Sequence, residues 1–356
     1  MIVFFQDLSN FLRQLLPNPI AVFLQYRFSP ADFESLNDVG RKQLSSSCVD
    51  TNSILFTFDM LSYNINNVAS SSPSRTRLIL RAIFSSGANI ILLQETNPAW
   101  EKLLQNDAAA LQFDYIYFHH PRLGDKDRPP DRPAGGMAIL SQYALKDIGV
   151  LDFTKDVSGS VFPALICKAI VPLSQFSNEV PHGLNDVCIS IANVHLRPPV
   201  ELDGRAWLST ARKTEPIRLA EIKGLVRRVM SAESSLDTLS APQHELDIIG
   251  GDFNEDNSGA ALSYLSTTLG YIDALQQYVP KMKETHTWPF MRNLLTLRKR
   301  LDHILWRNEL LSVTTKGGNT VRMLRLKCLG CGVITGFETG ASDHQPVLSR
   351  FGIVME

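Results

Sequence analysis

The feature that most constrains this chain is a set of polar residues that follow short apolar runs. Acidic, amide and imidazole side chains stand at the ends of stretches of β-forming residues, as Glu95 does after residues 90–93. Such polar groups cost free energy if they are buried without a partner. The segments are YNI at 63–65, LLQET at 92–96, NVHL at 193–196, GGDFN at 250–254, RLDHI at 300–304 and SDHQPV at 342–347.

Taken singly, each segment has an ordinary explanation. Asn64 could cap a turn, Glu95 could begin a helix, and residues 251–254 could form a loop. Together they supply what the hydrolysis of a phosphate ester needs: oxygen ligands for Mg²⁺, a base for water and groups that stabilise charge on phosphorus. The combination therefore favours a catalytic site over a series of unrelated caps and turns.

From residue 54 onward, short β-forming runs alternate with helical patterns, which is typical of layered α and β structure. Pro216 suits the first turn of an amphipathic helix over 215–230. Alternation alone is also compatible with a doubly wound parallel sheet. We expect strands at 54–58, 89–93, 137–140, 165–170, 187–194, 246–249 and 301–306, and a further helix at 75–84.

Composition excludes some classes of protein. The chain has 356 residues, of which 44% are hydrophobic and 20% charged, the balance of a globular protein rather than a disordered one. Its net charge of −1 gives no overall field that would attract a polyanion. It contains no apolar run long enough to span a membrane, and its start lacks the basic region of a signal peptide. We therefore expect an intracellular protein without a transmembrane segment.

Residues 1–50 are expected to form a separate leader. Phe4, Leu8, Phe11 and Leu15 recur at helical spacing before Pro17 ends the pattern. A helix packed on the main domain is the expectation for this leader. The cysteines are odd in number and scattered, which indicates reduced thiols rather than a disulfide framework. They are Cys48, Cys167, Cys188, Cys328 and Cys331.

The polar segments, together with GGMAILS at 135–141 and HTW at 286–288, resemble the motifs of the endonuclease/exonuclease/phosphatase superfamily. They occur in that superfamily's order, and the resemblance covers about residues 51–356, which we expect to be the catalytic domain. It implies a four-layer α/β sandwich, in which two mostly antiparallel β-sheets pack face to face with helices outside. It also implies a metal-dependent phosphoric ester hydrolase that uses Mg²⁺, with Mn²⁺ as a substitute.

The resemblance also assigns roles to residues. Glu95 is the expected main Mg²⁺ ligand, with Asn64 and Asp343 beside the metal. Asp252 is expected to orient or deprotonate the attacking water, and Asn254, on the same side of an extended chain, to bind a phosphate oxygen. His344 as an imidazolium, oriented by Asp302, is expected to stabilise charge on phosphorus, and His195 to protonate the leaving oxygen. Arg197, Thr287 and Trp288 are the expected substrate-binding residues.

The substrate is less constrained by the sequence. The HTW and RLDHI segments are most similar to those of the 5′-tyrosyl-DNA phosphodiesterase branch and of unassigned bacterial-type relatives. They favour a phosphodiesterase that acts on nucleic acid or a nucleic-acid adduct. The alternatives are a hydrolase of a phosphoinositide, sphingomyelin or another small phosphate ester, and a catalytically silent relative that serves as a binding or scaffold module. The oligomeric state is open.

Overall fold

The computed structural model describes most of the chain after residue 53. The described ranges are 54–106, 112–120, 135–173, 184–199, 208–233, 246–280, 286–292, 295–315, 317–334 and 341–355. The expected leader at 1–50 and Cys48 lie outside these residues. Within the described ranges, no helix has both the length and the apolar character that crossing a bilayer requires.

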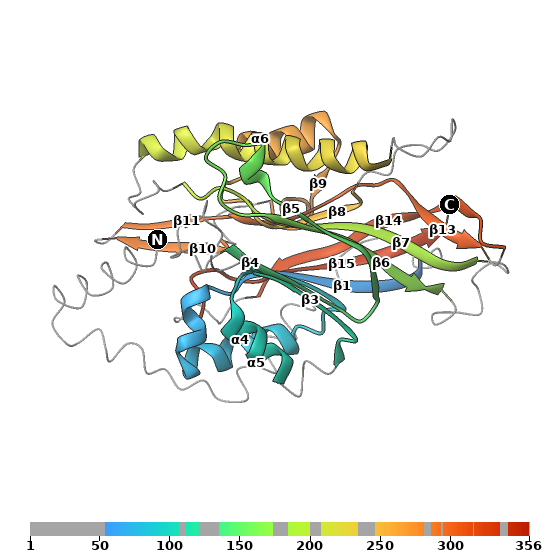
Figure 1. Cartoon of the computed structure of the whole chain (residues 1–356), viewed down its shortest axis with the longest axis horizontal. Helices are drawn as coiled ribbons and strands as arrows, with labels where there is room; N and C mark the ends of the chain where they lie inside the picture. Colours follow the sequence, from blue (N-terminus) through green and yellow to red (C-terminus); the bar gives the residue numbers. More distant parts are fainter. Residues whose placement is uncertain are drawn as a thin grey trace.

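A large curled β-sheet forms the body of the molecule (Figure 1). Its path is β3-β4-β2-β1-β15-β14-β13-β7-β8-β12-β9, and β6 and then β5 continue outward from β7. The strands are β1 (Ile54–Asn64), β2 (Ile90–Thr96), β3 (Tyr115–His119), β4 (Gly136–Ser141), β5 (Ala144–Leu151), β6 (Ala164–Pro172), β7 (Leu184–His195), β8 (Ile248–Asp252), β9 (Ile272–Asp273), β12 (Asp302–Trp306), β13 (Leu310–Thr315), β14 (Thr320–Val333) and β15 (Val347–Met355).

Helices and a hairpin complete the fold. The hairpin is a separate antiparallel pair, in which Trp288 lies opposite Lys299. Its strands are β10 (Trp288–Arg292) and β11 (Leu295–Lys299). The helices are α4 (Pro73–Ser85), α5 (Pro98–Asn106), α6 (Leu208–Glu233), α7 (Ala260–Ser263) and α8 (Ala274–Tyr278), with the short helical turns η2 (Asn67–Ser71), η5 (Phe153–Lys155) and η7 (Tyr264–Thr268).

Two pairs of neighbouring strands run parallel, and the other pairs among the described strands are antiparallel. The parallel pairs are β1 with β2, joined through α4, and β7 with β8, joined through α6. Each unit is a β-α-β crossover, which parallel neighbours require because a tight hairpin cannot connect them. The carboxyl ends of both pairs carry the polar segments identified in the sequence, so the two crossovers place the candidate site.

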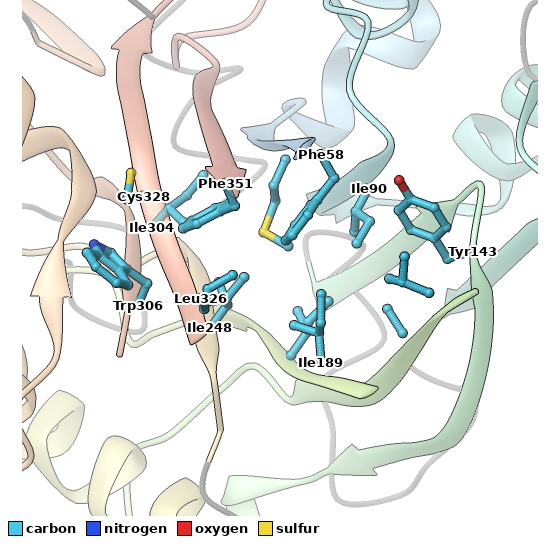
Figure 2. Close-up of a cluster of buried hydrophobic side chains, with 14 of the residues drawn as sticks. Phe58, Ile90, Tyr143, Ile189, Ile248, Ile304, Trp306, Leu326, Cys328 and Phe351 are labelled. Atoms are coloured by element: carbon cyan, nitrogen blue, oxygen red, sulfur yellow. The ribbon is translucent and has the colours of Figure 1, made fainter. Parts of the chain in front are cut away.

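Alternation along the strands separates a central core from two outer cores. On β1, Phe56, Phe58 and Met60 point into the central core, whereas Leu61 and Tyr63 point to the opposite face. This is the period-two pattern of a strand whose two faces are both covered. Figure 2 shows central-core side chains from the two halves of the sheet packed together, and most are fully buried; Phe58, Ile90, Ile189, Ile248 and Phe351 are among those labelled.

The sheet curls so that its two halves face one another. β1 packs across β8, and β2 packs across β7, with the central core between them. Helices α4 and α5 cover the outer face of the first half through buried residues such as Ile79 and Trp100. Helices α6 and α7 cover the other half, where Ile222 and Leu225 meet Val194 of β7. The predicted four-layer sandwich is confirmed, with the hydrogen bonds of β13 joining its two sheets at one edge.

One helix boundary differs from the sequence prediction. Helix α6 begins at Leu208, so Pro216 lies inside it rather than in its first turn. A proline in a helix removes one backbone hydrogen bond. Polar side chains brace this turn: Thr214 Oγ1 donates to the carbonyl of Thr210 at 2.9 Å and accepts from Arg218 Nη1 at 2.9 Å. The prediction was wrong because these side-chain contacts sustain the helix ahead of the proline.

The cysteines of the described residues are free thiols, as expected. Cys328 and Cys331 both lie in β14 and face the central core. Residues three apart on a regular strand point to opposite faces, but β14 has a bulge, where register with β15 shifts between Cys328 and Gly330. Burial raises the pKa of the Cys328 thiol to about 12, so neither metal binding nor nucleophilic chemistry is indicated there.

Gly251 provides a test of how β7 and β8 are joined. Its φ is +146°, and a Cβ built on it would lie 1.9 Å from the carbonyl oxygen of Val194. We expect Gly251→Ala to lower the free energy of unfolding by about 3 kcal/mol or more, because both the backbone conformation and the contact become unfavourable. Gly149→Ala is the control, since a Cβ there meets nothing within 4 Å; we expect a change within about 0.5 kcal/mol. Urea unfolding followed by circular dichroism measures both, and equal effects would contradict the prediction.

Candidate active site

The polar strand ends meet at one edge of the molecule. Asn64 ends β1 opposite Gln94 of the parallel strand β2, and Glu95 follows directly. In the other half, His195 ends β7 opposite Asp252, which ends β8. Asp302 begins the antiparallel strand β12 and also lies opposite Asp252. Strand direction and register therefore bring residues that are far apart in the sequence to one place.

The amide of Asn64 links the two halves of the site. Its Nδ2 lies 3.0 Å from Asp252 Oδ2 and 3.3 Å from Glu95 Oε1, and it donates to both carboxylates. Glu95 Oε2 also accepts the backbone N–H of Asn67 at 3.2 Å. Asn64 is fully buried and Asp252 is 1% exposed. The carboxylates of both halves are thus held by donors from the first crossover, at the end of β1 and the start of η2.

His344 is part of a buried acid–imidazole chain. Its Nδ1 lies 2.8 Å from Asp302 Oδ2, and its Nε2 lies 3.7 Å from Asp252 Oδ2. Burial alone would lower its pKa, but the charges of Asp302 and Asp252 outweigh burial and hold the pKa of His344 well above its usual value. His344 is therefore an imidazolium at neutral pH, oriented by Asp302 as the sequence predicts.

The site carries more negative charge than its own residues neutralise. Burial, and then the charge of Asp343, raises the pKa of Glu95 to about 7. Burial, and then the charge of Asp302, raises the pKa of Asp252 to about 7, although His344 acts in the opposite direction. Carboxyl groups with raised pKa values are ionised readily only when a further positive charge is supplied. This electrostatic environment fits a divalent cation.

Backbone strain is concentrated at this edge. Among the described residues, the non-glycine positions with positive φ are Asn66 (53°), Glu95 (59°), Asn254 (53°) and Asp147 (51°). All but Asp147 belong to the polar strand ends or to the turns that follow them. Such conformations cost about 1 kcal/mol or more and persist where the surrounding structure enforces them, typically at functional sites.

The backbone at Asn254 differs from the extended chain that the sequence predicted. The chain there is not extended, so alternation along a strand does not place its side chain beside that of Asp252. Instead, its backbone N–H donates to Asp252 Oδ1 at 2.9 Å, and its Nδ2 donates to the carbonyl of Leu196 at 3.0 Å. Asn254 does lie next to Asp252, but the left-handed turn after β8 puts it there.

His195 is held by packing rather than by a carboxylate. Its ring stacks on Phe162 with centroids 4.0 Å apart and an angle of 14° between the planes. Its Nε2 lies 3.5 Å from Asp252 Oδ2, and its buried Nδ1 has no hydrogen-bond partner among the described residues. Burial, and then the charge of His344, lowers the pKa of His195 to about 3. The ring is therefore neutral at neutral pH, unlike that of His344.

The predicted substrate-binding residues flank this cluster. Thr287 is fully buried, and its Oγ1 accepts the backbone N–H groups of Leu301 at 2.9 Å and Asp302 at 3.1 Å. Its hydroxyl thus fixes the start of β12. Trp288 is partly buried at the start of the hairpin β10–β11. Arg197 follows β7, is 5% exposed, and its backbone N–H donates to Glu221 Oε2 at 2.9 Å.

Two buried amide residues that connect the halves of the sheet were not identified as site residues from the sequence. Gln94 and Asn193 are fully buried between the two halves of the sheet, and Gln94 Nε2 donates to Asn193 Oδ1 at 2.7 Å. Asn193 Nδ2 in turn donates to the carbonyls of Leu93 and Ala138, each at 3.0 Å. Both residues lie inside the motifs LLQET and NVHL, and an amide within an apolar run was the only feature of the sequence that indicated them. The sequence does not show which groups they contact, because those contacts form between the two packed halves of the sheet.

Two groups of residues could hold a metal ion. Ligand atoms of Asp252, Asp302 and His344 lie within 4.8 Å of one another. However, His344 is protonated and its Nδ1 is committed to Asp302, so this group fits an acid–imidazole chain better than a metal site. The other group is the predicted one, Glu95 with Asn64 and Asp343, whose oxygen donors and unbalanced charge suit Mg²⁺.

Comparison with known proteins identifies this fold. No curated protein sequence matches the chain. A TDP2 from D. rerio humanised by 14 mutations is 16% identical, with 83% of this chain and 98% of that chain covered and a TM-score of 0.51. The catalytic domain of human Nocturnin with a bound sulfate anion is 15% identical, with 84% and 95% covered and a TM-score of 0.51.

A third solved structure is an endonuclease/exonuclease/phosphatase family protein from Leptotrichia buccalis C-1013-b. It is 15% identical, covers 83% of this chain and 99% of its own, and has a TM-score of 0.51. At these identities the likenesses establish the fold alone. The sequence model of the Endonuclease/Exonuclease/phosphatase family matches residues 61–344, a range that contains every segment of the site up to His344. The chain therefore belongs to the endonuclease/exonuclease/phosphatase family.

Proposed function

We propose that this protein is a Mg²⁺-dependent phosphodiesterase that acts on nucleic acid or a nucleic-acid adduct by metal-assisted attack of water on phosphorus. One observation carries the proposal. The carboxylates of Glu95 and Asp252, which come from different halves of the sheet, are joined by the Asn64 amide beside the charged His344–Asp302 pair. A binding or scaffold module has no need for two buried carboxylates with raised pKa values next to an imidazolium.

Glu95, Asn64 and Asp343 would hold the ion. Mg²⁺ takes oxygen ligands and keeps several waters, so a small set of protein donors leaves room for water and a phosphate oxygen. When bound, the ion neutralises charge on the phosphate and lowers the pKa of a coordinated water. Mn²⁺ has similar ligand preferences and would substitute.

Asp252 would orient the attacking water and accept its proton. Its pKa of about 7 is suited to exchanging a proton near neutral pH. Asn64 Nδ2 and the backbone N–H of Asn254 fix one oxygen of this carboxylate each. The Asn254 side chain stands directly beyond Asp252, where we propose that it binds a phosphate oxygen.

The histidines would have different tasks. His344, charged and oriented by Asp302, would stabilise the negative charge that develops on the phosphoryl oxygens. His195 is neutral, so it is a poor source of a full proton for the leaving oxygen. We therefore assign it a hydrogen-bonding role at the phosphate, in place of the general-acid role that the sequence suggested.

Nucleic acid is the substrate class that the site supports best. The net charge of −1 means that any polyanion must be met locally. D. rerio TDP2 has been solved complexed with a single-strand DNA product, and that chain shares 14% identity and a TM-score of 0.50 with this one. The hairpin that begins at Trp288 follows Thr287 directly, and we propose that this tryptophan stacks on a base of the substrate.

Metal dependence is tested by removing the ion and its main ligand. We expect EDTA to abolish hydrolysis of bis-p-nitrophenyl phosphate, and Glu95→Gln to lower kcat/KM by about 100-fold or more, because the charge that binds the ion is lost. Glu309→Gln is the matched control, since Glu309 is 55% exposed on the surface and pairs with Arg307. Full activity in EDTA would refute the metal-dependent mechanism.

The role of His344 predicts a shift in the pH profile. The mechanism needs the imidazolium, so the rate falls as pH rises through the pKa of His344. Asp302 raises that pKa, so Asp302→Asn should move the alkaline limb to lower pH and reduce kcat by about 100-fold.

Asp273→Asn is the control for this experiment. Asp273 Oδ2 lies 2.8 Å from His303 Nδ1, the same distance as in the Asp302–His344 pair, but His303 faces away from the site toward Phe253. This variant should lose stability yet keep the alkaline limb in place. An alkaline limb that moves in neither variant would show that His344 does not act as the imidazolium.

Substrate class is tested by assaying single-stranded DNA, RNA, tyrosyl-DNA and a phosphoinositide side by side. We expect the nucleic-acid substrates to have the highest kcat/KM. We also expect kcat/KM on them to fall about tenfold between about 50 and 200 mM salt, as for about two phosphate contacts. Preference for the phosphoinositide, with little dependence on salt, would overturn the nucleic-acid assignment and leave the hydrolytic mechanism intact.

A further inference from the structure

We infer that Asn66 is a positioning residue for the metal site, which it organises by holding Asp343. This inference rests on the proposed function, because it concerns the ion that Glu95, Asn64 and Asp343 would hold. Asn66 was not among the residues that the sequence motifs indicated. It lies just past the end of β1, between Asn64 and the turn η2.

The Asn66 side chain makes a short bond to a predicted ligand. Its Nδ2 donates to Asp343 Oδ1 at 2.6 Å, across 277 positions of sequence. Ser342 Oγ, next to Asp343, donates to the carbonyl of Asn64 at 2.7 Å and so fastens the same loop to the end of β1. Asp343 is therefore held between a side chain and a backbone anchor, and the side-chain bond fixes its carboxylate.

The backbone of Asn66 is tied to the other two predicted ligands. Its N–H donates to Asn64 Oδ1 at 3.1 Å, which turns the Nδ2 of Asn64 toward Glu95 and Asp252. The next residue, Asn67, donates its N–H to Glu95 Oε2 at 3.2 Å. Asn66 and its neighbour Asn67 thus contact all three predicted ligands.

The conformation of Asn66 is strained, and the strain serves these contacts. Its φ is 53°, and its Oδ1 accepts the N–H of Val68 at 3.1 Å, which caps η2. Asparagine tolerates positive φ better than most residues. A cap alone would be met by serine or aspartate as well. The Asn66 amide accepts from Val68 through Oδ1 and donates to Asp343 through Nδ2, whereas an ionised aspartate has no donor for Asp343.

Mg²⁺ binding to the full chain, measured by isothermal titration calorimetry without substrate, tests the inference. Asn66→Gly keeps the positive φ without strain and removes the bond to Asp343, and we expect its Mg²⁺ dissociation constant to rise about tenfold. Asp147→Gly is the matched control. It also has positive φ (51°), and it loses its side-chain bond to Lys168 Nζ at 2.8 Å, but it lies in β5 away from the site. Asn66→Gly removes the bond from Val68 as well as the bond to Asp343. Its Mg²⁺ affinity should equal that of the wild type.

A double-mutant cycle shows whether Asn66 acts through Asp343. In an Asp343→Asn background, the effect of Asn66→Gly on Mg²⁺ affinity should shrink from about tenfold to about twofold or less. An undiminished effect would show that Asn66 merely supports the local fold. Asn66→Ser keeps a cap for Val68 but is too short to reach Asp343, so it should weaken Mg²⁺ binding as Asn66→Gly does and provides the test if the glycine variant does not fold.

The outcomes separate this inference from the proposed function. Equal Mg²⁺ affinity in the wild type, Asn66→Gly and Asn66→Ser would overturn the inference alone. Absence of Mg²⁺ binding to the wild-type chain would overturn the proposed function and the inference with it. Weaker binding in both Asn66 variants, with unchanged binding in Asp147→Gly, would establish Asn66 as the residue that positions Asp343.

Discussion

Asn64 makes the contact on which the site depends, because its single amide joins the two halves of the sandwich. Its Nδ2 donates to Glu95 from one β-α-β unit and to Asp252 from the other. The carboxylate of Glu95 and the imidazole of His344 come from one half, whereas the carboxylates of Asp252 and Asp302 come from the other. The strands must first pack their apolar faces against one another, and the site then forms where their carboxyl ends meet. Folding and chemistry are thus linked through a buried hydrogen bond that requires both halves.

Two imidazoles in one site differ in charge because of what each ring contacts. His344 lies 2.8 Å from Asp302, and the nearby carboxylates keep it protonated. His195 stacks on the apolar ring of Phe162, and burial keeps it neutral. The raised pKa of His344 and the lowered pKa of His195 thus give one site two imidazoles of different charge near neutral pH. The distinction depends on Phe162 and Asp302, which are more than a hundred positions apart in the sequence.

The sequence predicted the polar strand ends because these depend on local pattern, whereas the four layers were predicted from the resemblance of the motifs to a known family. Apolar runs such as NIILL at 89–93 gave the buried strands, and the motifs gave Glu95, Asp252 and His344. Strand β14 was missed because its polar positions, including Arg322 and Lys327, interrupt the apolar pattern. The predictions of where α6 begins and of an extended chain at Asn254 were wrong for a related reason, since side-chain bonds and positive φ override simple periodicity. The Gln94–Asn193 contact could not be predicted because it exists only between packed halves.

Strained turns explain why such a site must sit at strand ends. Within a strand, alternate side chains point to opposite faces, so consecutive polar residues cannot reach one centre. Asn66, Glu95 and Asn254 all have positive φ where the chain leaves the strands. In two of these turns a backbone N–H donates to a carboxylate, that of Asn67 to Glu95 and that of Asn254 to Asp252. Each turn costs free energy that the packed core and the hydrogen bonds offset. The fold can maintain this arrangement because each strained residue is hydrogen-bonded to a carboxylate of the site, Asn66 to Asp343 and Asn254 to Asp252.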